Sequence, residues 1–146
     1  MKKVNKKASF AYKLEGERIE AGISLLGAEV KSVKIGRVDI STSTARIMDS
    51  EAYLINANIP VPNLTNYSST RTRKLLLHRG QLTSLSSKMK QRKLTLVPTS
   101  IYTKGRLVKI QLALGKPKRK FEKRQSIKKK DIEREIAQEF KNTGTT

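Results

Sequence analysis

Short runs of β-forming residues, separated by turn formers, fill most of residues 9–115 and constrain the fold more than any other feature. Residues 9–26, 43–59 and 93–115 each read as a hairpin, and residues 73–78 read as a further strand. We therefore expect about six short, mostly antiparallel strands. Such strands leave bare edges unless the sheet closes. The pattern predicts a mainly β fold, a small closed antiparallel barrel of the oligonucleotide-binding type.

Turns and short helices complete the predicted barrel. Residues 27–36 have helical spacing and end at Gly36, a typical C-terminal stop. Residues 80–92 place Leu82, Leu85 and Met89 on one helical face, so about two to three short helices are expected. The hairpin turns are expected at residues 15–17, 49–50 and 103–105, and Pro98 indicates an edge position or a bulge.

The composition changes abruptly after Gly115, which predicts two parts in the chain. Residues 1–115 form the predicted barrel of the oligonucleotide-binding type, and residues 116–146 form a basic tail. Ile132, Ile136 and Phe140 recur at helical spacing in the tail, but they make too narrow an apolar stripe for a stable isolated helix. We expect this tail to be disordered when free and helical when bound.

The net charge of +20, from 32 Lys and Arg against 12 Asp and Glu, indicates a polyanionic partner. Nucleic acid is the first expectation and an anionic membrane surface the second. The chain has no cysteine, which excludes disulfides and thiolate zinc sites. The N-terminus has cations without an apolar signal region, and no apolar run approaches membrane-spanning length. We expect a cytoplasmic monomer without metal or cofactor.

The segment RTRKLLLH, residues 71–78, joins strong positive charge to three leucines. In a strand the side chains alternate, so Leu75 and Leu77 share the inner face and Leu76 lies outside. Leu76 then either lies beneath the following helix or packs against a base or sugar. In the second interpretation, phosphates are held by Arg71, Arg73 and Lys74.

Enzyme signatures are weak in this sequence. It has no Gly-rich phosphate loop, and its single histidine, His78, has no second histidine or cysteine to share a metal. A metal-dependent nuclease would have to use Asp39, Asp49 and Glu51. Aromatic residues make up only 5%, which favours recognition of RNA shape and phosphates over extended base stacking. The tyrosines that could stack on bases are Tyr12, Tyr53, Tyr67 and Tyr102.

Several motifs in order along nearly the whole chain resemble the small protein B family, which binds transfer-messenger RNA. The most specific is TRTRKLLLH at residues 70–78. The others are NKKA (5–8), EAG (20–22), GAEVKSVKIGRV (27–38), LTLVP (94–98) and FEKR with IKKKD (121–131). The chain departs from the family pattern with Phe10 in place of histidine, Pro117 at the entry to the tail, and Glu122 in place of aspartate.

The resemblance implies a non-enzymatic protein with an oligonucleotide-binding-type barrel and a tail. Members bind the transfer-RNA-like domain of transfer-messenger RNA and accompany the alanyl-charged RNA, with elongation factor Tu, to stalled ribosomes. The tail is implied to probe the empty decoding site and the mRNA channel. A generic barrel that binds single-stranded or structural RNA remains the alternative.

The resemblance also implies site residues. The family's RNA-binding positions fall on Asn5, Glu20, Leu76 and Lys109. Phosphate contacts are expected from the neighbouring cations Lys6, Lys7, Lys31, Arg71, Arg73 and Lys74. The ribosome-probing residues of the tail are expected to be Lys116, Lys118, Phe121, Glu122, Lys123, Arg124, Lys128, Lys129 and Lys130.

Overall fold

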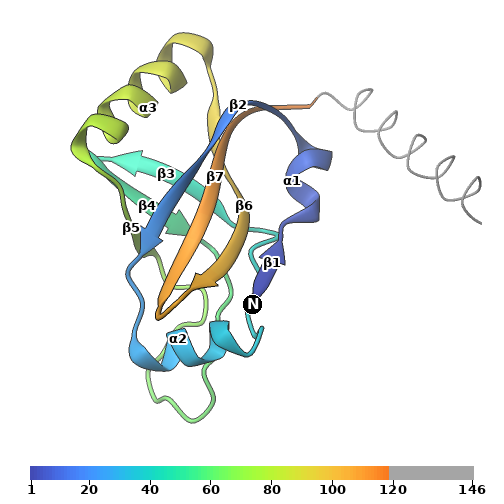
Figure 1. The fold of residues 1–146 in the computed structure, drawn as a ribbon, viewed down its shortest axis with the longest axis vertical. Coiled ribbons are helices and arrows are strands. Elements are labelled where there is room, and N and C mark those ends of the chain that lie inside the picture. Colours follow the sequence, from blue (N-terminus) through green and yellow to red (C-terminus); the bar gives the residue numbers. More distant parts are fainter. Residues whose placement is uncertain (119–146) are drawn as a thin grey trace, which may run out of the picture.

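A computed structural model describes residues 1–118, which contain seven strands and three helices (Figure 1). The chain follows the order β1 (Lys2–Val4), α1 (Lys6–Ala11), β2 (Tyr12–Ile23), α2 (Gly27–Lys34), β3 (Thr44–Met48), β4 (Glu51–Ile55), β5 (Arg73–Leu76), α3 (Arg79–Arg92), β6 (Thr95–Lys104) and β7 (Leu107–Pro117). The predicted mainly β class, with short helices between strands, is confirmed.

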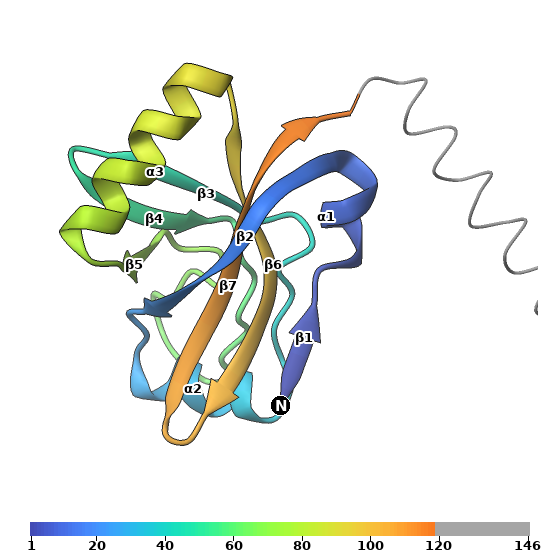
Figure 2. The same cartoon turned by 45° about the horizontal axis from the view of Figure 1, so that its top comes forward.

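The strands close into an antiparallel barrel. Their order is β1-β6-β3-β4-β5-β2-β7, and β6 also pairs with β7, so the strands from β2 to β7 form a ring. β1 adds to the outside of this ring by pairing with β6. Figure 2 shows β2, β6 and β7 crossing the front of the barrel, with α2 at one end and α3 beside the other. The predicted barrel closure is thereby confirmed.

Several local predictions are also confirmed. The β3–β4 hairpin turns at Asp49 and Ser50, whose φ angles of 50° and 61° match a tight hairpin turn. β6 and β7 form the last hairpin around Gly105, with φ of 62°. The register between them shifts after Pro98, which is the predicted bulge. α2 and α3 occupy the two segments with helical spacing, and Gly36 follows α2 with φ of 84°.

The predicted hairpin over residues 9–26 is wrong. Its first residues belong to α1, and β2 is one long strand whose two halves both pair with β7. Gly16, with φ of 74°, lies in a bulge between Glu15 and Ile19 and does not form a turn. A glycine between two glutamates resembles a turn in sequence, and only the partner strand reveals that the chain continues.

The barrel extends past the predicted boundary at residue 115. β7 runs to Pro117, where Lys116 pairs with Lys13 and Pro117 pairs with Tyr12. The backbone N–H of Lys118 then donates to Ala11 O at 2.9 Å. Lys116 and Lys118, predicted as tail, therefore lie against the barrel. The other predicted tail residues, from Phe121 to Lys130, lie outside the described residues.

The barrel interior holds the core. Leu54, Ile59, Leu75, Leu96 and Ile110 are fully buried there, and Leu82 and Leu85 attach α3 to the same cluster. Among residues 1–118, no helix has the length and apolar character needed to cross a lipid bilayer.

Candidate nucleic-acid interface

Leu76 lies on the outside of the barrel with 54% of its surface exposed, whereas Leu75 is buried. The predicted alternation along β5 is therefore correct, and Leu76 does not lie beneath α3. Its side chain lies across β2 at Gly22, where an added Cβ would come within 3.2 Å of Leu76 Cβ. Because Gly22 has no side chain, Leu76 can pack directly on the backbone of the neighbouring strand. This packing holds the apolar surface of Leu76 in one place.

A row of residues in register continues from Leu76 across the barrel surface. Leu76 pairs with Gly22 of β2, Gly22 pairs with Lys109 of β7, Lys109 pairs with Tyr102 of β6, and Tyr102 pairs with Lys2 of β1. We call these five residues the cross-strand row. Adjacent strands lie about 4.8 Å apart, so the step from Leu76 to Tyr102 covers roughly 14 Å. The structure thus places the predicted residues Leu76 and Lys109 on one surface.

Glu20 lies beside this row, two residues before Gly22 on the same face of β2. The hydroxyl of Tyr102 donates a hydrogen bond to Glu20 Oε2, and Lys104 Nζ lies 3.5 Å from Glu20 Oε1. The hydrogen bond from Tyr102, aided by Lys104, lowers the pKa of Glu20. Partial burial and the bond to Glu20 raise the pKa of Tyr102 to about 12. Glu20 is thus an oriented, ionised hydrogen-bond acceptor.

Tyr102 is a residue of this surface that the sequence patterns did not single out. It was one of four tyrosines considered for base stacking. The alternation along β6 gave the only available signal, since it sets Tyr102 on the face opposite to the buried Ile101. Its hydroxyl fixes the Glu20 carboxylate, and its ring stands in register with Lys109.

Lys74 also faces outward, two residues before Leu76. Its Nζ lies 3.3 Å from Glu51 Oε2, and both side chains remain more than 40% exposed. Exposed ion pairs of this kind contribute little to the stability of the fold, and their side chains can readily bind other partners. A groove beside Leu76 is lined by Lys74, His78, Arg79 and Lys109. Lys74 is therefore free to turn from Glu51 to a phosphate.

Arg73 does not belong to this interface, which corrects its predicted role in phosphate binding. Its side chain is fully buried and forms an ion pair with Glu29 at 2.6 Å. Its remaining N–H groups donate to Ala57 O at 2.8 Å, Tyr67 Oη at 2.9 Å and Ser69 O at 3.0 Å. With its donors committed inside the protein, this guanidinium cannot reach RNA.

Arg71 shares the same acid. Its guanidinium pairs with Glu29 while 32% of its side chain stays exposed. Tyr67 Oη also donates to Glu29 Oε2 at 2.8 Å. We call Glu29, Tyr67, Arg71 and Arg73 the Glu29 cluster. It holds the loop after β4 against α2, so two of the three cations of residues 71–74 that were expected to bind phosphate serve the fold.

Burial alone would raise the pKa of Glu29. Hydrogen bonds from Arg71, the Leu26 backbone, Tyr67 and Arg73 outweigh it and lower the pKa from about 4.5 to about 2. A carboxylate with a lowered pKa in the folded state contributes stability above its unfolded pKa and loses it as the pH falls toward the folded pKa.

We expect the free energy of unfolding to drop by about 3 kcal/mol between pH 5 and pH 2 through Glu29 alone. Urea denaturation at several pH values measures this change. The Glu29→Gln variant should lack that part of the dependence of the unfolding free energy on pH. Equal slopes for the two proteins would show that Glu29 does not titrate in this range.

The remaining predicted residues fall into two groups. Asn5 is buried, and its Nδ2 donates to Pro98 O at 2.9 Å and to Ile40 O at 3.2 Å, so it ties α1 to the barrel. Its Oδ1 is buried without a hydrogen-bond partner in the described part of the chain. The cations Lys6 and Lys7 are exposed on α1, and Lys31 is exposed on α2 at one end of the barrel (Figure 1).

The three carboxylates considered for a nuclease do not gather at one place, although Asp49 and Glu51 line the same groove beside Leu76. Asp39 accepts a hydrogen bond from the Ser41 backbone, and Glu51 pairs with Lys74. Across residues 1–118, no group of three histidine or carboxylate side chains could hold a metal ion. The surface of the described barrel offers contacts for binding and no assembled set of metal ligands.

The model of the SmpB protein family matches residues 2–142. The chain belongs to the SmpB family. Among similar SmpB relatives, the SsrA-binding protein of Halothermothrix orenii is 47% identical over 140 residues, covering 94% of this chain and 90% of the relative. The SsrA-binding protein of Corynebacterium diphtheriae is 43% identical over 139 residues, with 93% and 85% covered.

A solved structure supports the same family fold. One of its chains is 38% identical to this SmpB-family chain with a TM-score of 0.68, covering 86% of this chain and 94% of the other. That structure is described as "tmRNA-SmpB: a journey to the center of the bacterial ribosome". The residue resemblance and the barrel geometry therefore lead to the same family.

Proposed function

We propose that this protein is a non-enzymatic RNA-binding factor that binds the transfer-RNA-like domain of transfer-messenger RNA and brings it to stalled ribosomes in the cytoplasm. The observation that carries the proposal is the cross-strand row, which sets Leu76 and Lys109 on one surface beside Glu20. Family membership supports it. Elongation factor Tu would join through the alanyl-charged RNA, and the protein would act as a monomer without a cofactor.

Each part of the row suits a different part of a folded RNA. Leu76 offers apolar surface for an unstacked base or a sugar. Lys109, with Lys74 nearby, offers charge to phosphates, which position a protein on RNA. The ionised Glu20 repels phosphate but accepts hydrogen bonds from the amino or imino groups of a base edge. A surface of this kind favours a particular RNA shape over a uniform single strand.

A binding assay tests the proposal with three RNAs: the transfer-RNA-like domain, an ordinary transfer RNA and poly(U). We expect the transfer-RNA-like domain to bind most tightly at fixed salt. Equal affinity for all three would favour the alternative of a generic RNA-binding barrel.

Binding should depend steeply on salt. If about five to eight phosphates are contacted, log K falls against log salt with a slope of roughly −4 to −7. Lys74→Ala should make this slope shallower by about one contact. The matched control is Arg73→Lys. Because residue 73 is buried, this change should leave the salt slope unchanged as long as the protein stays folded. A slope near zero for the parent protein would mean that the net positive charge is not used in this complex.

The segment after the barrel should act at a later step. β7 runs to Pro117, and the Lys118 N–H donates to Ala11 O. A chain that ends at Lys118 keeps these contacts, so it should keep its melting temperature and most of its RNA affinity. It should fail to support peptidyl transfer to alanyl transfer-messenger RNA on stalled ribosomes. The double change of Lys123 and Arg124 to alanine should reproduce part of this failure. Loss of RNA affinity on truncation would place the segment in the first binding surface.

A further inference from the structure

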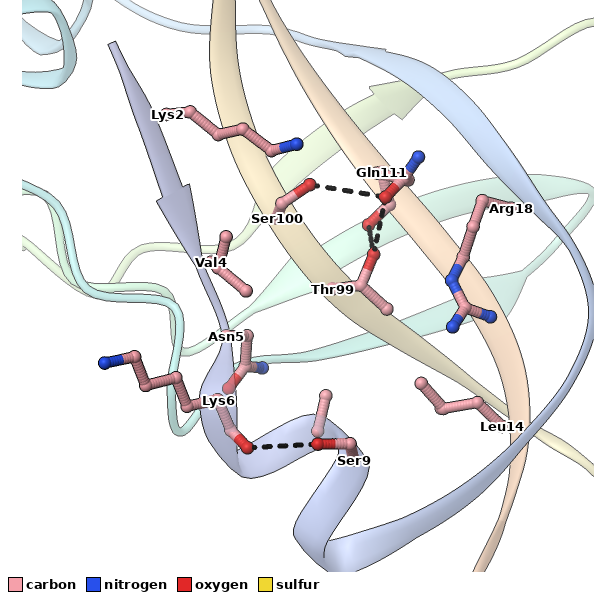
Figure 3. Close-up of a pocket in the computed structure, with 11 residues that line it drawn as sticks. Lys2, Val4, Asn5, Lys6, Ser9, Leu14, Arg18, Thr99, Ser100 and Gln111 are labelled. Carbon is pink, nitrogen blue, oxygen red and sulfur yellow. Dashed lines mark hydrogen bonds between the residues drawn. The ribbon is translucent and has the colours of Figure 1, made fainter. Parts of the chain in front are cut away.

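A hollow of about 370 Å³ lies between β1, α1, β2 and the β6–β7 hairpin (Figure 3). Its polar lining comes from Lys2, Asn5, Lys6, Ser9, Arg18, Thr99, Ser100 and Gln111, and its apolar lining from Val4, Ala8 and Leu14. Two predicted RNA-binding residues, Asn5 and Lys6, line this hollow, and Lys2 ends the cross-strand row at its rim.

Two bulges open the hollow. In β2 the pairing with β7 stops at Glu15 and resumes at Ile19, so Arg18 is carried on an unpaired stretch. In β6 the register shifts between Pro98 and Ser100, which leaves Thr99 as the extra residue. Bulges bend a strand and redirect its side chains. Arg18, on the unpaired stretch of β2, lines the hollow together with Gln111 of β7 (Figure 3).

The charge of the hollow is positive and unbalanced. Lys2, Lys6 and Arg18 line it, and no aspartate or glutamate does. Within residues 1–118, the ion pairs are all made by other cations. In Figure 3 the Lys2 side chain reaches toward Ser100 and Gln111, whereas the Lys6 ammonium points away from them. Cations that face one concave space repel each other, and a bound anion relieves that repulsion. The hollow is therefore suited to an anionic ligand.

Gln111 adds an uncharged donor. The Ser100 hydroxyl lies 3.5 Å from Gln111 Oε1, and the Thr99 hydroxyl lies between Gln111 O at 3.1 Å and Oε1 at 3.3 Å. These bonds turn the amide nitrogen of Gln111 outward, as Figure 3 shows. Nε2 donates no hydrogen bond to another residue in the described chain, so it can donate to a ligand oxygen.

The hollow continues the RNA-binding surface. Gln111 pairs with Glu20 on one side and Ser100 on the other, two residues along from Lys109 and Tyr102. That step is about 6.8 Å along a strand. A chain lying over Leu76 and Lys109 would therefore meet the hollow next. Its apolar wall of Val4, Ala8 and Leu14 offers room beyond a phosphate for a sugar or base.

We propose that the hollow binds one unstacked nucleotide of the RNA. Its phosphate lies between Lys2 and Arg18, and a base or sugar oxygen accepts a hydrogen bond from Gln111 Nε2. The site rests on the proposed function and extends the RNA path from the cross-strand row to α1. The nucleotide belongs either to transfer-messenger RNA or to ribosomal RNA, because both present the same phosphate chemistry.

The test uses the full chain with Lys2→Gln, Arg18→Gln and Gln111→Glu. The matched controls are Lys34→Gln and Arg37→Gln, which remove exposed cations at the end of α2. Each protein is titrated against the isolated transfer-RNA-like domain and against small ribosomal subunits at several salt concentrations, after its melting temperature has been checked.

We expect each cation variant to make the salt slope shallower by about one contact in one of the two titrations. Gln111→Glu should weaken the same complex at least tenfold, since it turns a donor into an anion. The affected titration identifies the source of the nucleotide.

The proposal is overturned if all three variants match their controls in both titrations. If Leu76→Asp still weakens binding in that case, only the hollow is refuted. If Leu76→Asp also has no effect, the proposed function is refuted with it.

Discussion

Replacement of Leu76 by aspartate is expected to weaken binding to the transfer-RNA-like domain at least about 30-fold, or about 2 kcal/mol, as for a central contact residue. The side chain is 54% exposed and seated on Gly22, so the barrel should stay folded. The loss should come from removing apolar surface and placing a carboxylate among phosphates. Fluorescence anisotropy with labelled RNA measures it, and far-UV circular dichroism checks the fold.

Leu64→Asp is the matched control for this prediction. Leu64 is also an exposed leucine, at 43%, but it lies in the loop between β4 and β5. We expect the Leu64→Asp variant to bind RNA within about twofold of the affinity of the parent protein. An unchanged affinity for Leu76→Asp would remove Leu76 from the interface. An unfolded Leu76→Asp variant would mean that Leu76 is buried in solution.

Replacement of Glu29 by alanine is expected to lower the free energy of unfolding by about 3–5 kcal/mol, because it leaves the buried Arg73 without its counter-charge. Glu29 and Arg73 are both fully buried, and Arg71 and Tyr67 bind the same carboxylate. For a domain of this size we expect the melting temperature to fall by roughly 10–20 °C. Differential scanning calorimetry at pH 7 measures the change.

Glu51→Ala provides the comparison. It breaks the exposed pair with Lys74 and should cost less than about 1 kcal/mol. If both glutamates gave equally small losses, the Glu29 cluster would not stabilise the fold at neutral pH.

The alternation along β5 shows how much of this site the sequence could predict. It correctly placed Leu75 inside and Leu76 outside. The same alternation puts Arg73 on the inner face with Leu75, yet positive charge favoured a surface role. Arg73 can be buried because Glu29 comes from α2, some forty residues earlier in the chain. The burial of a charged side chain can be predicted only if its partner is known. Sequence spacing does not reveal that partner.

The region from Lys2 to Ile19 was the least predictable. β1 is three residues long with two lysines, and α1 has six residues, so neither carries a periodic signal. The β2 bulge depends on the register with β7, which lies about ninety residues away. The hollow between the two bulges depends on both registers at once, so local patterns could not locate it.

The pairing pattern divides the barrel into two halves joined by narrow seams. β2, β7 and β6 pair along many residues, while β3 pairs with β4 at five positions and β4 pairs with β5 at three. The halves meet through two residue pairs between β2 and β5 and one between β3 and β6. Leu76 belongs to one half and Lys109 to the other, on either side of the first seam. An RNA that contacts both residues would hold the halves together, and its binding energy would then oppose opening of the barrel.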